Sequence, residues 1–443
     1  MIYPLKLPGI TRRRLTDIVL LQMSLLYHAA NTPDVSQKSC ACYLSAHPRF
    51  HTSSDKIAQW IWRKSVERQH LMYFAATYCS VDTREREAER RVKIAWCVRL
   101  RKEVEALLAL DDLPIKIRPF NETDACADQV PAWVEHAKNF LLYFYDEILG
   151  DSQKKFPPEL FSDPHAKEFG REEMLAAFLR KNNAEVCSTC DGSRYYTSGK
   201  HVHTDLDHYL PKSLYPHLAC HPYNLVPSCP HCNLLKKDKD LLLYIQEDRK
   251  YKLSKAIFPY HNFNLSRVTY LEVTPASAAE FITIGAIRRR PDQTEAEMSQ
   301  TIENAICLQQ ELYNIPGRWQ NHEQALRIGD TLFRRMRQFL ADGKGAILGS
   351  GMPAEVYNSL KQLLYYLDRE DQQKDPFAFA MTWVLATLIQ QQHSDPHLKA
   401  ALVAEINSWF SQNLRESKQR DMYVEELLRI IESHQEQAGT PPS

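Results

Sequence analysis

Long apolar runs are missing from this sequence of 443 residues. No stretch of about 18 uninterrupted apolar residues occurs, so the sequence predicts no membrane-spanning helix. The nearest candidate, LTDIVLLQMSLLYHAA after Arg12, Arg13 and Arg14, is interrupted by Asp17 and Gln22. We therefore interpret it as an amphipathic helix and not as a signal peptide, and we expect a cytoplasmic protein with no membrane partner.

Net charge and glycine are also scarce. Lys and Arg together number 55, as do Asp and Glu, so the formal net charge is zero. A protein that grips nucleic acid along its whole surface is usually basic. Any nucleic-acid contact is therefore expected to be local, or to be assisted by a partner. Only 13 glycines occur, well below the usual ~7 %, and this scarcity indicates a helix-rich protein.

The helical pattern divides the chain into regions. Apolar residues three and four positions apart predict helices on both sides of a block rich in cysteine and histidine, and RVTYLEV and FITIGAI are the best strand candidates. We predict a mainly α fold, with helical N- and C-terminal regions flanking a small zinc-pinned finger. The expected boundaries are 1–150 for the N-terminal helices, 151–183 for a linker and lead-in helix, 184–262 for the cysteine- and histidine-rich domain, 263–434 for short strands followed by helices, and 435–443 for a disordered tail.

The cysteines predict one structural zinc site. Eleven cysteines, an odd number, in a chain without a secretory signal favour reduced thiols and a metal site over disulfides. Two C-x-x-C pairs, Cys187 with Cys190 and Cys229 with Cys232, supply four soft ligands. Four thiolates saturate a tetrahedral zinc ion and leave no open position for water. We therefore expect one zinc ion per chain that stabilises the finger and takes no part in the chemistry.

Three further metal-capable side chains lie between the two pairs. Cys220, His217 and His221 lack the paired spacing of the zinc ligands. Because the four cysteines already complete a closed site, we expect these three side chains to lie at the surface or to face a substrate.

The polar residues between the pairs predict a strand and then a helix. In HVHTDLDHYLP, Asp207 and His208 point to opposite sides of a strand unless the strand ends there, and Pro211 favours an end near His208. The run HCNLLKKDKDLLLYI follows Pro230, which suits the first position of a helix. Successive helical residues differ by about 100°, so Asn233 and the cysteine before it can face different sites.

The combined pattern resembles a known family. C-x-x-C, D-H-x-x-P-K-S, N-L and C-x-x-C-N-x-x-K, over roughly residues 184–240, are similar to the HNH endonucleases, whose fold is the ββα-metal finger. The resemblance implies that His208 is the general base and that Asp207 and Asn233 hold a catalytic Mg²⁺ or Mn²⁺. It also implies that Asn224 orients the histidine.

The chemistry of these residue types agrees with that implied site. An imidazole with an ordinary pKa near ~6.5 can take a proton from water at neutral pH. Carboxylate and amide oxygens suit Mg²⁺, which stabilises charge on a phosphate. Lys212, Lys236 and Lys237 are the expected phosphate contacts. His231, two residues before Asn233, is not the expected ligand.

A second resemblance extends beyond the finger. PKSLYPHL, NLVPSCPHCNLLK, FITIGAI and TIENAICLQQELYN are similar to the HNH proteins of bacterial anti-phage systems of the Septu and retron-associated kind. This resemblance implies a regulated DNA endonuclease with an ATPase or sensor partner, and a homo-oligomer is also compatible with it. Two alternatives remain open, a non-catalytic zinc-finger adaptor that binds nucleic acid and an HNH nuclease that cuts RNA.

Overall fold

The computed structural model describes a large part of the chain. The described residues are 4–63, 65–109, 117–122, 130–151, 154–163, 167–182, 186–192, 197–198, 201–202, 205–236, 260, 265–274, 283–289, 302–303, 305–321, 328, 331–332, 334–335, 361–365, 367 and 377–391. Lys237, the continuation of the helix after it, and the tail 435–443 lie outside the described residues. What is described is mainly helical, as the sequence predicts.

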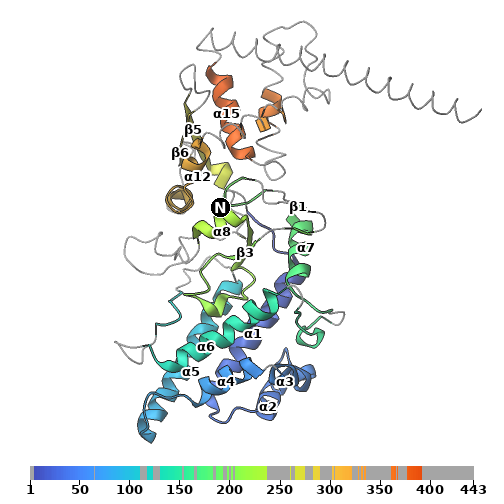
Figure 1. Cartoon of the computed structure of the whole chain (residues 1–443), viewed down its shortest axis with the longest axis vertical. Helices are drawn as coiled ribbons and strands as arrows, with labels where there is room; N and C mark the ends of the chain where they lie inside the picture. The colour runs from blue at the N-terminus through green and yellow to red at the C-terminus, as the bar shows by residue number, and fades with distance from the viewer. Residues whose placement is uncertain are drawn as a thin grey trace, which may run out of the picture.

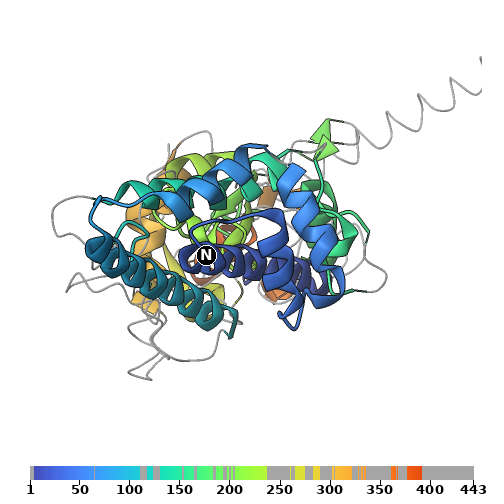
Figure 2. The ribbon, with the colours of Figure 1, turned by 90° about the horizontal axis from the view of Figure 1, so that it is seen from below.

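The N-terminal region is a helical bundle, drawn at the bottom of Figure 1. Its elements are α1 (Gly9–Asn31), α2 (Gln37–Ser45), the 3₁₀ helix η1 (His51–Ser53), α3 (Ser54–Arg63), α4 (Ser65–Ala76), α5 (Thr83–Ala109), α6 (Ala132–Tyr143) and the π-helix η2 (Phe144–Leu149). The helix α1 contacts α2, α4 and α5, and α4 packs on α6. Figure 2 shows α1 lying among the other helices of this region.

The amphipathic character expected for α1 is wrong in one respect. The helix is buried around most of its circumference, because even Thr11, Asp17 and Gln22 lie in the interior. Each of these polar side chains therefore needs a partner inside the protein. Gln22 donates from Nε2 to the carbonyl oxygen of Leu141 in α6, at 2.9 Å. The residues that interrupt the apolar run thus connect the helix to its neighbours.

The segment expected as a linker is instead packed against the bundle. Phe156 and Phe169 form an antiparallel bridge and are both buried, and Leu160 lies in the 3₁₀ helix η3 (Pro158–Leu160). The lead-in helix is α7 (Arg171–Asn182), as predicted. The segment packs because its phenylalanines are buried, whereas its charged residues and prolines, on which the linker prediction was based, indicate only an exposed side.

The cysteine- and histidine-rich segment lies between the bundle and the C-terminal elements (Figure 1). Its elements are the two-residue strands β1 (Thr197–Ser198) and β2 (His201–Val202), then β3 (Asp205–His208), η4 (Pro216–Leu218), β4 (Leu225–Ser228) and α8 (Pro230–Lys236). The strand β3 ends at His208 and α8 begins at Pro230, as the sequence predicts.

Both predicted strands of the C-terminal region are present. They form an antiparallel pair, β5 (Thr269–Thr274) with β6 (Thr283–Arg289), which has an irregularity between Leu271 and Val273. The described helices of this region are α10 (Leu265–Val268), the π-helix η6 (Leu308–Leu312), α12 (Ile315–Gln320) and α15 (Ala378–Gln391). The helix α12 contacts β6, and α15 contacts β5.

Candidate metal centre and active site

Four cysteines form a cluster that can hold a metal ion. The Sγ atoms of Cys187, Cys190, Cys229 and Cys232 all lie within 4.8 Å of one another, and all four residues are buried. The Sγ atoms of Cys190 and Cys229 are 3.8 Å apart. Tetrahedral zinc with Zn–S bonds of ~2.3 Å places its sulfurs about 3.8 Å apart. The donor set and its spacing therefore fit a structural zinc ion.

Hydrogen bonds to sulfur support thiolates at this centre. The backbone N–H of Cys229 points to Cys187 Sγ at 3.5 Å, and that of Cys232 points to Cys229 Sγ at 3.4 Å. Arg318 donates from Nη1 to Cys232 Sγ at 3.4 Å. Burial opposes the charge of Arg318, but the thiolates of Cys190 and Cys232 outweigh burial and raise its pKa. These donors reduce the negative charge that four thiolates concentrate around a metal.

Asp191 connects this centre to α15. It follows the first cysteine pair with a left-handed φ of 58° and is fully buried. Its Oδ2 accepts hydrogen bonds from the backbone N–H groups of Phe379, at 2.7 Å, and Ala380, at 3.4 Å. These amides belong to the first turn of α15, where helix N–H groups lack partners within the helix. Asp191 thus caps a helix almost 190 positions away in the chain.

The acid–histidine pair lies at the end of a short hairpin. Asp207 pairs with Val226 and His208 with Leu225 in the antiparallel register of β3 with β4. The strand β4 leads directly into α8, which contacts β3 and carries Asn233. The order along the chain is therefore strand, strand, helix, with the second cysteine pair at the junction of β4 and α8.

Two contacts fix the ring of His208. Its Nε2 lies 3.0 Å from the carbonyl oxygen of Ala219. Because a carbonyl only accepts, Nε2 carries the proton of the neutral ring and Nδ1 carries the lone pair. The ring of Tyr145, from η2, meets the imidazole edge-on with centroids 4.2 Å apart, and its hydroxyl donates to Leu206 O at 2.8 Å. Burial, followed by the charges of Lys236 and Lys212, lowers the pKa of His208 to about 3.

Asp207 is held by an internal cation. The ammonium group of Lys236 lies 2.6 Å from Asp207 Oδ2, and the two side chains are 3 % and 11 % exposed, respectively. Lys236 also donates to the carbonyl oxygen of His208. Burial raises the pKa of Asp207 and lowers the pKa of Lys236, while each charge favours the ionised form of the other. Lys236, expected at a phosphate, is instead paired inside the protein.

Asn224 supports the loop that follows β3. It is fully buried, and its Oδ1 accepts from Leu210 N at 2.6 Å. Its Nδ2 donates to Leu210 O at 3.1 Å and to Leu218 O at 3.0 Å. The carbonyl of Ala219 that meets the histidine ring follows Leu218 directly. Asn224 therefore acts on His208 through the loop, since its described hydrogen bonds go to the backbone around the ring.

The remaining predicted residues lie around this pair. Lys212 is 38 % exposed and forms an ion pair with Asp146. Its ammonium group lies 5.0 Å from the ring centroid of Tyr145, which itself packs on the catalytic candidate histidine. Asn233 is half-buried on α8, and His231 is exposed on the same helix. Of the three predicted phosphate contacts, Lys212 is the one whose described position is open to solvent.

The expected surface position of three side chains is wrong. Cys220, His217 and His221 are all fully buried. His217 Nε2 lies 3.1 Å from Glu103 Oε2, and His221 Nε2 lies 3.2 Å from the carbonyl oxygen of Val104. Both partners belong to α5, so these histidines attach the segment to the N-terminal bundle. No local sequence signal indicates this, since the partners lie more than 100 positions earlier in the chain.

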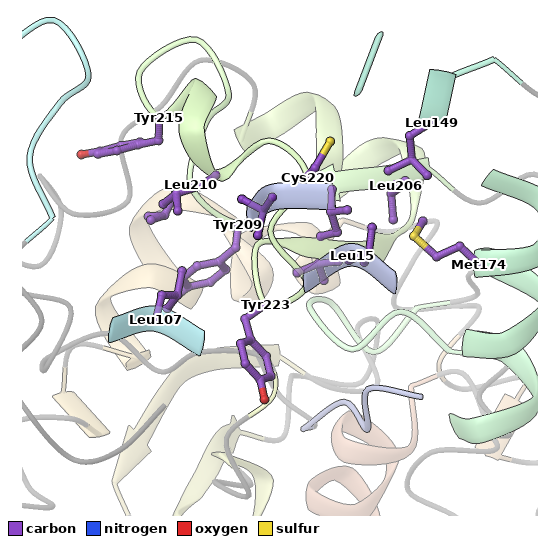
Figure 3. Packing of buried hydrophobic residues seen from close by; sticks show 14 of the residues in the cluster. Leu15, Leu107, Leu149, Met174, Leu206, Tyr209, Leu210, Tyr215, Cys220 and Tyr223 are labelled. Atoms are coloured by element: carbon purple, nitrogen blue, oxygen red, sulfur yellow. The ribbon is translucent and has the colours of Figure 1, made fainter. Parts of the chain in front are cut away.

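The buried face of the segment packs into the bundle. Figure 3 shows Tyr209, Leu210 and Cys220 close to Leu15 of α1 and Leu107 of α5, and all of these residues belong to one apolar cluster. This packing fixes the loop between β3 and β4 against the bundle, and after β4 the Sγ of Cys232 accepts from Arg318.

Comparison with known proteins yields no match, whether with family models, with curated proteins or with solved structures. None of the helices in the described ranges combines the length and the apolar character that a membrane crossing needs.

Proposed function

We propose that this chain is a metal-dependent endonuclease of the HNH type, which hydrolyses phosphodiester bonds in DNA. One observation carries the proposal. An Asp–His pair ends β3, its partner strand β4 leads straight into α8 with Asn233, and the cysteine cluster brackets the hairpin. A zinc-binding adaptor needs the cysteines but has no requirement for an acid, a histidine and an amide in this arrangement.

His208 is the proposed general base. With Nε2–H committed to Ala219 O, the lone pair on Nδ1 is the atom that would take a proton from water. The low pKa of this buried ring weakens it as a base in the state described. A bound phosphate brings negative charge, and an opposite charge nearby favours the protonated imidazole and raises its pKa. Substrate binding would therefore strengthen the base that acts on it.

The proposed catalytic cation is Mg²⁺ or Mn²⁺. Asp207 and Asn233 would hold it, because carboxylate and amide oxygens are the donors that these ions prefer. When bound, such an ion stabilises the charge that builds on the scissile phosphate. The Lys236 ammonium already bonds to Asp207 Oδ2, so this oxygen becomes available only when the lysine moves.

The burial of the pair supports a regulated enzyme. His208 and Asp207 are only 7 % and 9 % exposed, and a phosphodiester cannot reach either residue without a rearrangement. A chain with zero net charge also lacks a general attraction for DNA. We propose that a partner, such as an ATPase or sensor of an anti-phage system, opens the site in the cytoplasm. The isolated protein should then cut DNA slowly at physiological salt.

Cleavage of supercoiled plasmid tests the proposal. Wild type, His208→Ala and His231→Ala are incubated with plasmid and, in parallel, with RNA, in Mg²⁺, in Mn²⁺ and in EDTA. The control His231 is an exposed histidine on α8. We expect metal-dependent nicking by wild type and His231→Ala, and none by His208→Ala. Equal cutting by all three proteins would remove the assigned base. Because slow cutting is expected of the isolated protein, retention of plasmid in a gel shift without cutting by any protein even after prolonged incubation would favour the adaptor. Cutting of RNA alone would favour the RNA nuclease.

A further inference from the structure

A pocket of ≈ 420 Å³ opens between α1, α5 and the segment after α2. Its walls combine three arginines with two leucines, a threonine and one acid. They are Arg12, Arg13, Thr16, Leu20, Arg49, Glu105 and Leu108. The volume lies within the range of ~300–1,000 Å³ that is typical of small-molecule sites.

The charges at this pocket do not cancel. Glu105 is engaged by Arg101, whose Nε lies 2.7 Å from its Oε1. Arg49 pairs with the buried Asp17 at 2.5 Å. Neither Arg12 nor Arg13 belongs to these two ion pairs. The pocket and its surroundings therefore contain four guanidinium groups and two carboxylates, those of Asp17 and Glu105. Burial lowers the pKa of the nearby His47, and the positive charges of Arg101 and Arg49 lower it further.

Two of the arginines are held in place before any ligand binds. Asp17 also accepts from the N–H and the hydroxyl of Ser162, at 3.2 and 3.1 Å, so Arg49 bonds to a fixed carboxylate. Arg49 remains 43 % exposed. Arg12 lies over the ring of Tyr223 at 5.4 Å and donates to Leu108 O at 3.5 Å. Guanidinium groups held in this way lose little conformational entropy when they bind an anion.

Arg13 is the arginine without a committed role. It is exposed, and within the described part of the chain no acidic side chain pairs with it. Guanidinium groups present several N–H donors in a planar fork that matches phosphate oxygens. Leu20 and Leu108 add an apolar wall, which suits an ester with an organic group better than a bare anion. From these contacts we propose that the pocket binds a phosphate ester, either a mononucleotide or the backbone of a nucleic-acid strand.

The position of the pocket links it to the hairpin. Tyr223, under Arg12, directly precedes Asn224, which holds the loop around His208. Three non-covalent contacts therefore connect the pocket to the proposed base: Arg12 with the Tyr223 ring, Asn224 with Leu218 O, and Ala219 O with His208. The site goes beyond the proposed hydrolysis and does not depend on it, because binding in this pocket requires neither the histidine nor a divalent cation.

Binding measurements on the full-length protein in magnesium-free buffer test the inference. The probes are AMP and ATP in calorimetry, and a fluorescein-labelled 12-nucleotide DNA strand in anisotropy. The test variant is Arg13→Ala. The matched control is Arg84→Ala, an exposed arginine at the opposite end of α5. Loss of one charge-assisted hydrogen bond weakens binding by about tenfold or more.

Each outcome decides the inference. Nucleotide binding that weakens about tenfold in Arg13→Ala and not in Arg84→Ala supports a small-ligand site. The same difference seen only with the labelled strand supports a backbone contact. Absence of binding by every probe, or equal effects of the two variants, overturns the inference. Because no step requires cleavage, a negative result here leaves the plasmid test of His208 unaffected, and the reverse also holds.

Discussion

Replacement of Lys236 by methionine probes the ion pair beneath the proposed active site. Methionine keeps a long unbranched side chain and removes the charge. The Asp207 carboxylate would then stay buried without its cation, since the two side chains are only 11 % and 3 % exposed. Breaking one side of a buried pair costs about 3–5 kcal/mol, and loss of the donor to His208 O adds about 1 kcal/mol. We expect Lys236→Met to lower the free energy of unfolding by about 5 kcal/mol.

A double variant separates the charge from the packing. Asp207→Asn with Lys236→Met removes both ions, so no charge remains uncompensated. We expect a loss of about 1–2 kcal/mol for the double variant, less than for Lys236→Met alone. Urea unfolding followed by far-UV circular dichroism in zinc-containing buffer gives the free energies, and hydrogen exchange in α8 gives the local effect. A Lys236→Met protein within 1 kcal/mol of wild type, or a double variant that loses as much stability as Lys236→Met alone, would refute the buried pair.

Two further predictions concern the rest of the fold. Asp191→Ala removes a helix cap, so it should raise hydrogen exchange at the first amides of α15 and lower the free energy of unfolding by about 2 kcal/mol, whereas Asp191→Asn should lower it by about half as much. Equal zinc content in both proteins excludes metal loss as the cause. Unchanged exchange in Asp191→Ala would contradict the cap. Burial lowers the pKa of Lys93 from 10.5 to about 8. Between these values the unfolded chain binds more protons, so this group adds stability as pH rises. The free energy of unfolding of wild type, relative to that of Lys93→Met, should therefore rise by about 2 kcal/mol from pH 8 to pH 10. A difference between the two proteins that does not change with pH in urea unfolding would argue against this.

Local patterns predicted those features that short-range chemistry determines. Paired cysteine spacing predicted the cluster, and the structure brings its four sulfurs together. Pro211 and Pro230 predicted where β3 ends and α8 begins, because proline restricts the backbone at its own position. The best strand candidates of the sequence, RVTYLEV and FITIGAI, contribute to β5 and β6.

Features that depend on distant partners were not predictable in this way. Lys236 looks like any lysine in the first turns of a polar helix, and its burial follows from the position of Asp207 on β3. His217 can bind a metal by its chemistry, but in the structure it lies next to Glu103 of the N-terminal bundle. The cap by Asp191 requires a helix from the far end of the chain. In each case the sequence contains the chemical group, and only the tertiary packing selects its partner.

The packing of the loop after β3 determines whether the cysteine- and histidine-rich segment can fold apart from the rest of the chain. Its aromatic and aliphatic side chains, Tyr209, Leu210, Tyr215 and Leu218, are buried within the same cluster as Leu15 and Leu107 of the N-terminal helices. An excised fragment of residues 184–262 would expose this face to water and would tend to aggregate. The segment that carries the four-cysteine cluster is therefore not an independent module. Because the loop after β3 completes the interior of the helical region, a substitution in the loop alters the packing of the helices, and a substitution in the helices alters the packing of the loop.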